Sequence, residues 1–146
     1  MIKIKIKKLT PDAIIPHYVH EGDAGMDVYS TIYFNLESNH RAMISTGLSF
    51  EIPKGFELQV RPKSGIAIKK GVTLLNTPGT LDSGYRGELK VIMINHSSED
   101  YEIKKGEKIA QIVLAKYEEA EIEEVKELSE TTRGSGGFGS TGLRKN

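Results

Sequence analysis

The sequence contains no cysteine. Disulfide bonds, a thiolate nucleophile and a zinc site built from cysteine thiolates are therefore excluded. An excess of charge of one sign is also missing, because 20 basic residues balance 20 acidic ones. A chain with a formal net charge of +0 is not expected to carry the broad cationic face that polymeric nucleic acid requires.

Long hydrophobic runs are absent as well, and none approaches the length needed to cross a membrane. The first seven residues alternate isoleucine with lysine instead of building the apolar segment of a signal peptide. We therefore expect a soluble, cytoplasmic protein that binds neither membranes nor polymeric nucleic acid.

The length of 146 residues predicts one domain, because domains typically contain about 150 residues. A hydrophobic content of 38% supplies a real core, although not a large one. A deep ligand site in so small a chain can require a second subunit.

Short segments rich in β-branched residues dominate the chain. Residues 2–9 alternate in polarity with a period of two, which is typical of a strand with one buried face. Glycine and proline separate the segments, so a sandwich or barrel is expected. The other predicted strands are 27–34, 42–52, 56–60, 89–95 and 108–117. The acidic segment 117–130 fits either one short helical turn around Val125 and Leu128 or a final strand.

The composition changes at Ser129, and residues 129–142 contain almost nothing to bury. On composition alone this segment is a disordered tail. Its arginine, phenylalanine and glycines also suit a second interpretation, in which the backbone N–H groups wrap a phosphate and Arg133 adds a bidentate fork. Ser140 stands where a P-loop has lysine, so a P-loop NTPase is excluded.

Residues 76–87 contain two short apolar segments around Pro78-Gly79, which predicts a β-hairpin. Asp82 would then lie beside a hydrophobic strand, where a fixed carboxylate can act as general base toward a water molecule. The alternative is that Asp82 only caps a turn.

Two further segments combine glycine with charged side chains. Residues 61–65 place cationic and hydroxyl groups beside a glycine and suit phosphate oxygens, although a basic surface loop would have the same sequence. Residues 23–27 place two carboxylates near a glycine turn and suit Mg²⁺, although turn capping is the commoner role.

Taken together, these segments resemble the trimeric dUTPase family, the deoxyuridine 5′-triphosphate nucleotidohydrolases. The resemblance runs from Ala24 to Gly142 and includes all five family motifs in order. The motif-like segments are AGMDVYS at 24–30, RPKSGIA at 61–67, NTPGTLDSGYRGE at 76–88, GEKIAQ at 106–111 and RGSGGFGSTG at 133–142. The ordered set is highly specific. The chain departs from the family at Lys63 and Lys108, where arginine is usual, so the charge is kept and the planar fork is lost.

The resemblance implies an all-β, jelly-roll-like barrel with at most one short helix and a flexible glycine-rich C-terminal tail. Residues 1–128 would form the barrel domain, and residues 129–146 a lid over a neighbouring subunit's site. It further implies a homotrimer with active sites shared between subunits. The implied reaction is hydrolysis of dUTP to dUMP and pyrophosphate, which keeps uracil out of DNA and supplies dUMP for thymidylate synthesis.

The resemblance also assigns roles to residues. Asp82 would deprotonate the attacking water, and Asp27 would hold Mg²⁺ through its water shell. Tyr85 would exclude a 2′-hydroxyl, and Phe138 would stack on the uracil. The implied substrate-binding residues are Lys63, Ser64, Gly65, Asn76, Thr80, Leu81, Tyr85, Lys90, Gln111, Arg133, Phe138, Gly139, Ser140 and Thr141.

Two alternatives stay open at this point. A dCTP deaminase would share the barrel, although no Arg-Ser-Ser segment of the deaminase type is present. A non-catalytic dUTPase-like nucleotide-binding or regulatory protein is the other alternative, and the intact Asp27, Asp82 and Arg133 count against it.

Overall fold

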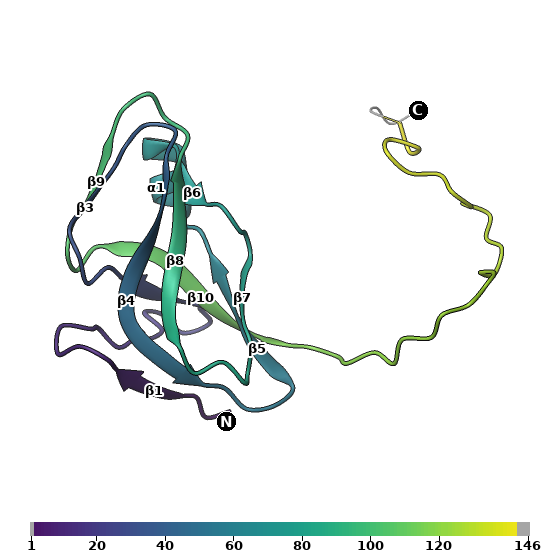
Figure 1. The fold of residues 1–146 in the computed structure, drawn as a ribbon, viewed down its shortest axis with the longest axis horizontal. Coiled ribbons are helices and arrows are strands. Elements are labelled where there is room, and N and C mark those ends of the chain that lie inside the picture. Colours follow the sequence, from purple (N-terminus) through teal and green to yellow (C-terminus); the bar gives the residue numbers. More distant parts are fainter. Residues whose placement is uncertain (1, 143–146) are drawn as a thin grey trace.

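A computed structural model describes residues 2–142 of the chain. Met1 of the predicted barrel domain and residues 143–146 of the predicted lid lie outside the described residues. Ten strands and one short helix occur in the described part, which confirms the predicted all-β class (Figure 1). No helix in residues 2–142 is long and apolar enough to span a membrane.

Two four-stranded antiparallel sheets form the body of the protein. Sheet A has the order β1 (Lys5–Lys8), β4 (Arg41–Glu51), β8 (Glu88–Asn95) and β6 (Val72–Leu74). Sheet B has the order β2 (Gly25–Tyr29), β10 (Lys108–Lys116), β5 (Phe56–Arg61) and β7 (Gly79–Leu81). A third, two-stranded sheet pairs β3 (Phe34–Leu36) with β9 (Tyr101–Ile103).

Alternating side chains build the core, as the period-two patterns predict. In β8, for example, Leu89, Val91 and Met93 are buried, whereas Lys90 is exposed. The largest fully buried apolar side chains come from strands of all three sheets, so one core serves the whole body. They are Leu36, Ile44, Leu48, Leu58, Met93, Ile103, Ile109 and Ile112.

Three local expectations were wrong. The predicted strand 27–34 is two strands in different sheets, because the buried Ser30 hydroxyl donates to the carbonyl of Ile32 and closes a turn. The predicted hairpin at 76–87 is not formed, since β6 pairs with β8 while β7 pairs with β5. Residues 117–130 form neither the helical turn nor the strand.

The helix α1 (Ser64–Lys70) was not predicted as such. Its sequence includes a glycine and two isoleucines, which are poor helix formers, and it buries no residue fully. Gly71 ends the helix with a left-handed φ of 64°, and its N–H donates to the carbonyl of Ala67. Because β5 leads directly into α1, the loop 62–63 between them has a fixed position next to sheet B.

Candidate active site

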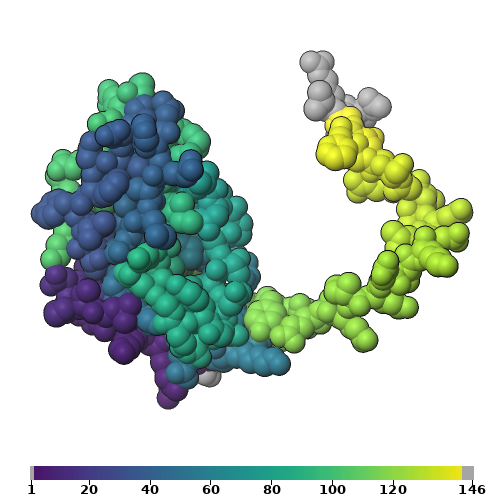
Figure 2. Space-filling model, viewed as in Figure 1, coloured from purple at the N-terminus to yellow at the C-terminus, as the bar shows by residue number. Residues whose placement is uncertain are grey.

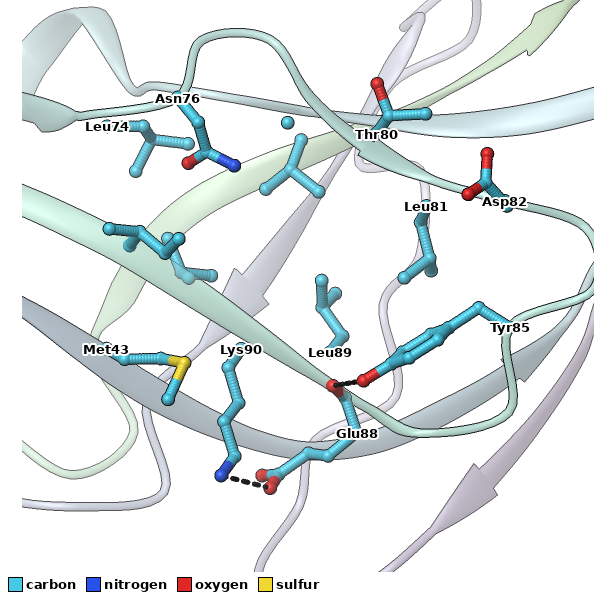
Figure 3. Close-up of a pocket in the computed structure, with 14 residues that line it drawn as sticks. Met43, Leu74, Asn76, Thr80, Leu81, Asp82, Tyr85, Glu88, Leu89 and Lys90 are labelled. Atoms are coloured by element: carbon cyan, nitrogen blue, oxygen red, sulfur yellow. Dashed lines mark hydrogen bonds and ion pairs between the residues drawn. The ribbon is translucent and has the colours of Figure 1, made fainter.

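A cavity of about 470 Å³ opens between β7 of sheet B and β8 of sheet A. Its volume lies in the range of small-molecule sites. Six residues to which the family resemblance assigned roles line it together, the implied base Asp82 and five implied substrate-binding residues: Asn76, Thr80, Leu81, Tyr85 and Lys90 (Figure 3). Met43 and Ile92 line it too and were missed, because the fold and not any local motif brings β4 and β8 to this place. Glu88, the last residue of the motif-like segment 76–88, also lines it without having been given a role.

The loop between β7 and β8 is held by its own hydrogen bonds. The N–H of Tyr85 donates to the carbonyl of Asp82 at 3.1 Å, and the Tyr85 hydroxyl donates to the carbonyl of Glu88 at 3.1 Å. Arg86 donates to the carbonyl of Ser83 at 2.7 Å. The Tyr85 ring is therefore directed toward the start of β8, as Figure 3 shows, and the loop presents Asp82 at the rim of the cavity.

Glu88 joins this loop to the bend in β4. Its Oε1 accepts a hydrogen bond from the N–H of Gly47 at 2.9 Å, where the β4–β8 register shifts and Gly47 has a φ of 68°. Its Oε2 lies 3.7 Å from the Nζ of Lys90. The Glu88 carboxylate thus contacts both the β-bulge of β4 and the Lys90 side chain beside the cavity.

A second cavity, of about 420 Å³, lies beside β2 and β10. Its lining includes the predicted site residues Asp27, Lys63 and Gln111, together with Lys108. Both lysines that stand where arginine is usual in the family therefore meet here. Ser64 and Gly65 follow Lys63 as the first residues of α1 and are not among the lining residues. Asp23, Ala24 and Gly25 also line it and belong to the carboxylate turn at residues 23–27, whereas the sequence did not assign Val19 and His20.

Asp27 is bound by two lysines in this second cavity. Its Oδ1 accepts a short hydrogen bond from Lys63, and its Oδ2 lies 2.8 Å from the Nζ of Lys108. Burial alone would raise the pKa of Asp27, but the hydrogen bonds and charges of Lys108 and Lys63 outweigh burial and lower it. The same contact raises the pKa of Lys108. The predicted metal-holding carboxylate is thus paired with Lys63, an implied substrate-binding residue, and with Lys108, the other lysine that stands where arginine is usual.

Gln111 is placed by two contacts. Its Nε2 donates to the carbonyl of Pro62 at 3.0 Å, and its Oε1 occupies space that a Cβ atom at position 25 would need. Glycine at position 25 therefore permits the close approach of β2 and β10 at this point.

The two cavities share no lining residue among the described residues, and they lie at opposite edges of sheet B. Asp27 lies on β2 and Asp82 directly follows β7, three strand spacings or about 14 Å apart. The strand register separates the two residues further. Gln111 of β10 pairs with both Asp27 of β2 and Arg61 of β5, whereas Leu81, next to Asp82, pairs with Leu58 of β5. Asp82 lies one residue beyond Leu81, so it is also displaced along the strands by four residues, or about 13 Å. One chain therefore does not bring Asp27 and Asp82 together.

The tail lies away from both cavities. After β10 the chain leaves the body and extends from it, as the ribbon and the space-filling view agree (Figures 1 and 2). Arg133 donates through its Nε to the carbonyl of Gly136 at 2.8 Å, and Phe138 is fully exposed. Arg133, Phe138, Gly139, Ser140 and Thr141 therefore do not meet the other predicted site residues within this chain.

A metal held by protein groups alone would need a cluster of ligands. Within residues 2–142 there is no group of three or more His, Asp or Glu side chains arranged to hold a metal ion. Mg²⁺ commonly keeps several waters and binds one or two carboxylates together with substrate phosphates. Asp27, which lines the second cavity with Asp23 and lies beside cations suited to phosphate, fits that second arrangement.

Comparison with known proteins identifies the family. The family model for dUTPase matches residues 11–142. The chain is 57% identical over 141 residues to the deoxyuridine 5′-triphosphate nucleotidohydrolase of Nautilia profundicola, with 97% of this chain and 99% of the relative covered. It is 54% identical over 143 residues to the enzyme of the same name from Clostridioides difficile, with 98% and 100% covered.

A solved structure agrees with the fold. The dUTPase of Staphylococcus bacteriophage 80alpha, in complex with dUpNHpp, superposes with a TM-score of 0.90 at 28% sequence identity, covering 97% of this chain and 99% of that chain. The fold agrees with the family match over most of the chain. It also agrees with relatives that are more than 50% identical and that are aligned over 97% or more of both chains. The chain therefore belongs to the dUTPase family.

Proposed function

We propose that the hydrolysis of dUTP to dUMP and pyrophosphate by this chain takes place where the β7–β8 cavity of one subunit meets the β2–β10 cavity of another. The observation that carries the proposal is the separation of Asp82 from Asp27 in sheet B. Each cavity holds one half of the predicted site, and only a second copy can bring the missing half within reach. A homotrimer, as the family resemblance implies, supplies such interfaces for three sites.

Asp82 is the general base of the proposed mechanism. It follows β7, is exposed at the rim of the cavity and is reachable by water. The carboxylate would accept a proton from a water molecule that attacks the α-phosphorus in line with the departing pyrophosphate. Hydrogen bonds within the loop 82–88 hold Asp82 at the rim of the cavity before substrate arrives.

The β7–β8 cavity would take the deoxyuridine. The Asn76 amide and the backbone groups of residues 80–90 can match the N3–H donor and the carbonyl acceptors of uracil. Cytosine presents the opposite pattern and would leave polar groups buried without partners. The Tyr85 ring would lie under the sugar, where it leaves no room for a 2′-hydroxyl. The dUTPase of bacteriophage 80alpha is bound to dUpNHpp, an analogue of dUTP, which supports this class of ligand.

The β2–β10 cavity would take the phosphate chain. Lys63 and Lys108 would neutralise phosphate charge, while Ser64, Gly65 and Gln111 would orient the chain. Asp27 would hold Mg²⁺ through its water shell, and the metal when bound would neutralise phosphate oxygens as charge develops. The lysines lack the bidentate fork of arginine, so orientation depends more on the hydrogen-bonding neighbours.

The tail would complete the site of a neighbouring subunit. Residues 129–146 would close as a lid, with Phe138 on the uracil and Arg133, Ser140 and Thr141 on the γ-phosphate. Gly139 would give the backbone room at the turn between these two groups, since it has a φ of 99°. Closure would exclude water and fix the triphosphate for attack.

Product analysis tests the proposal. Pyrophosphate release is measured from dUTP, dCTP, dTTP and UTP side by side, with Mg²⁺ and with a chelator. We expect release from dUTP with Mg²⁺ and little from the other nucleotides. Light scattering should give the mass of a trimer. Ammonia release from dCTP, or full activity in a purely monomeric fraction, would contradict the proposal.

A further inference from the structure

One carboxylate in the described part of the chain, Asp27, is paired with two ammonium groups. Asp27 is only 15% exposed at its side chain, and Lys63 and Lys108 reach it from two different segments. Each lysine takes one carboxylate oxygen, so both oxygens of Asp27 are engaged. Among residues 2–142, the ion pairs of these two lysines involve no other acid.

The sheet fixes this arrangement. Asp27 and Gln111 are paired across β2 and β10, and Gln111 is paired in turn with Arg61 at the end of β5. Lys63 follows β5 by two residues, and Lys108 begins β10 opposite Tyr29, with its Nζ 6.0 Å from the centre of the Tyr29 ring. Lys63 therefore reaches Asp27 from the two-residue connection between β5 and α1, and Lys108 reaches it from the first residue of β10.

Asp23 provides a contrast in the same cavity. It carries the same charge as Asp27, but its Oδ2 accepts a hydrogen bond from the backbone N–H of His20 at 2.9 Å. It makes no ion pair with either lysine within the described residues. Proximity to the cavity alone therefore does not explain the pairing of Asp27.

We propose that Asp27 is an internal counter-ion that occupies Lys63 and Lys108 in the nucleotide-free chain and competes with the triphosphate for them. This inference rests on the proposed function, because the lysines must be phosphate ligands. A triphosphate without metal has to displace the carboxylate and then lies next to it with like charge. A metal ion carried with the triphosphate removes that repulsion at Asp27.

The exchange adds a specificity role to Asp27. Anions that bring no metal, such as a free nucleotide, must break two charged hydrogen bonds before they contact the lysines. The metal-loaded triphosphate offers Asp27 a cation in place of the lysines it gives up. Asp27 therefore favours the metal-loaded substrate over other anions, besides any effect on the reaction itself.

Binding without metal tests the proposal. The affinity of dUpNHpp is measured by calorimetry in a chelator and again in Mg²⁺, for the wild-type chain and for Asp27→Asn. We expect Asp27→Asn to bind the metal-free analogue about tenfold more tightly, because the lysines are released to the phosphates. We also expect most of the gain in affinity that Mg²⁺ gives the wild-type chain to be lost.

Asp23→Asn is the matched control, since it removes the same charge from the same cavity without touching the lysines. It should change metal-free affinity by much less than Asp27→Asn. Equal gains in both variants, or no gain in Asp27→Asn, would overturn the counter-ion role. Failure of the wild-type chain to bind dUpNHpp with Mg²⁺ would instead overturn the proposed function.

A measurement on the wild-type chain covers the case in which Asp27→Asn does not fold. NMR of the lysine ammonium groups should show Lys63 and Lys108 protected from exchange in the free protein, because both are hydrogen-bonded to Asp27. Adding dUpNHpp with Mg²⁺ should shift both signals, and adding deoxyuridine should not. Rapidly exchanging signals in the free protein would contradict the pairing.

Discussion

The ring and hydroxyl of Tyr85 occupy the space that a Cβ atom at position 87 would need. The hydroxyl at that point donates to the carbonyl of Glu88, the first residue of β8. Glycine at position 87 is therefore what lets the aromatic ring fold back over its own loop. The orientation of the proposed sugar-sensing side chain thus depends on a residue that has no side chain of its own.

Replacing Gly87 with alanine should displace the Tyr85 ring without removing it. Both Gly87→Ala and Tyr85→Ala should relax discrimination against UTP, by about tenfold or more in the ratio of kcat/KM for dUTP and UTP. Gly84→Ala is the matched control, because a Cβ atom there has nothing within 4 Å. Unchanged rejection of UTP in both Tyr85→Ala and Gly87→Ala would place the sugar selection elsewhere.

Asp82→Asn should remove turnover and keep affinity for the nucleotide. The amide has the shape of the carboxylate but cannot accept the proton of the water, and general-base catalysis contributes about 10²–10⁴-fold. Single-turnover kinetics with dUTP and calorimetry with dUpNHpp measure the two quantities separately. Turnover near that of the wild-type chain would mean that another group is the base.

Tyr101 offers a prediction about stability away from the proposed site. Burial raises the pKa of the Tyr101 hydroxyl above its ordinary value of 10.0. The hydrogen bond to Glu107 and the negative charge of Glu107 raise this pKa further. A raised folded-state pKa contributes stability that is fully present below about pH 10 and is lost as the pH rises further. We therefore expect the free energy of unfolding of the wild-type chain to fall above pH 10.

Tyr101→Phe should lower the free energy of unfolding by about 1–3 kcal/mol at neutral pH, because a hydrogen bond to a carboxylate is lost. Its curve above pH 10 should be flatter than that of the wild-type chain. Denaturant unfolding at several pH values measures both effects. The control is Tyr33→Phe, since Tyr33 is 70% exposed. If the free energy of unfolding of Tyr101→Phe fell as steeply above pH 10 as that of the wild-type chain, Tyr101 would be excluded as the source of the fall.

Local patterns in the sequence predicted much of the barrel. The long strands β4, β8 and β10 are rich in β-branched and apolar residues, and the predicted ranges 42–52, 89–95 and 108–117 lie close to them. Short strands were missed where three residues carry no periodic signal, as in β6. Turns were misjudged where tertiary pairing decides, because Pro78-Gly79 connects two sheets and not two strands of one hairpin.

The candidate site was predictable as a set of residues but not as an arrangement. The family resemblance named Asp27, Lys63 and Asp82 from their motifs. No motif reports that Asp27 is paired with two lysines, since the pairing depends on the register of β2, β10 and β5. Glu88 was missed as a support of the cavity because its partner Gly47 is 41 residues away in the sequence.

The last prediction concerns the tail, which is either a disordered segment or a lid over a neighbouring site. Deleting the tail would have different effects in these two cases. A chain that ends before Arg133 should keep its thermal stability, since almost every residue of the tail is exposed and contributes little to the core. If the tail is a lid, kcat should fall about 10²-fold, because the triphosphate is no longer fixed for attack, while affinity for dUpNHpp falls much less.

A chain that ends after Gly142 is the control, because it keeps the whole glycine-rich motif from Arg133 onward. It should retain kcat, which separates loss of the motif from the effect of any shortened end. Phe138→Ala should lie between the two chains, since it removes the stacking ring but keeps Arg133, Ser140 and Thr141. The proposed lid would add no chemistry of its own and would act only by closing, so its loss should appear in kcat and not in folding. An unchanged kcat in the chain that ends before Arg133 would return the segment to the simpler interpretation, a disordered tail.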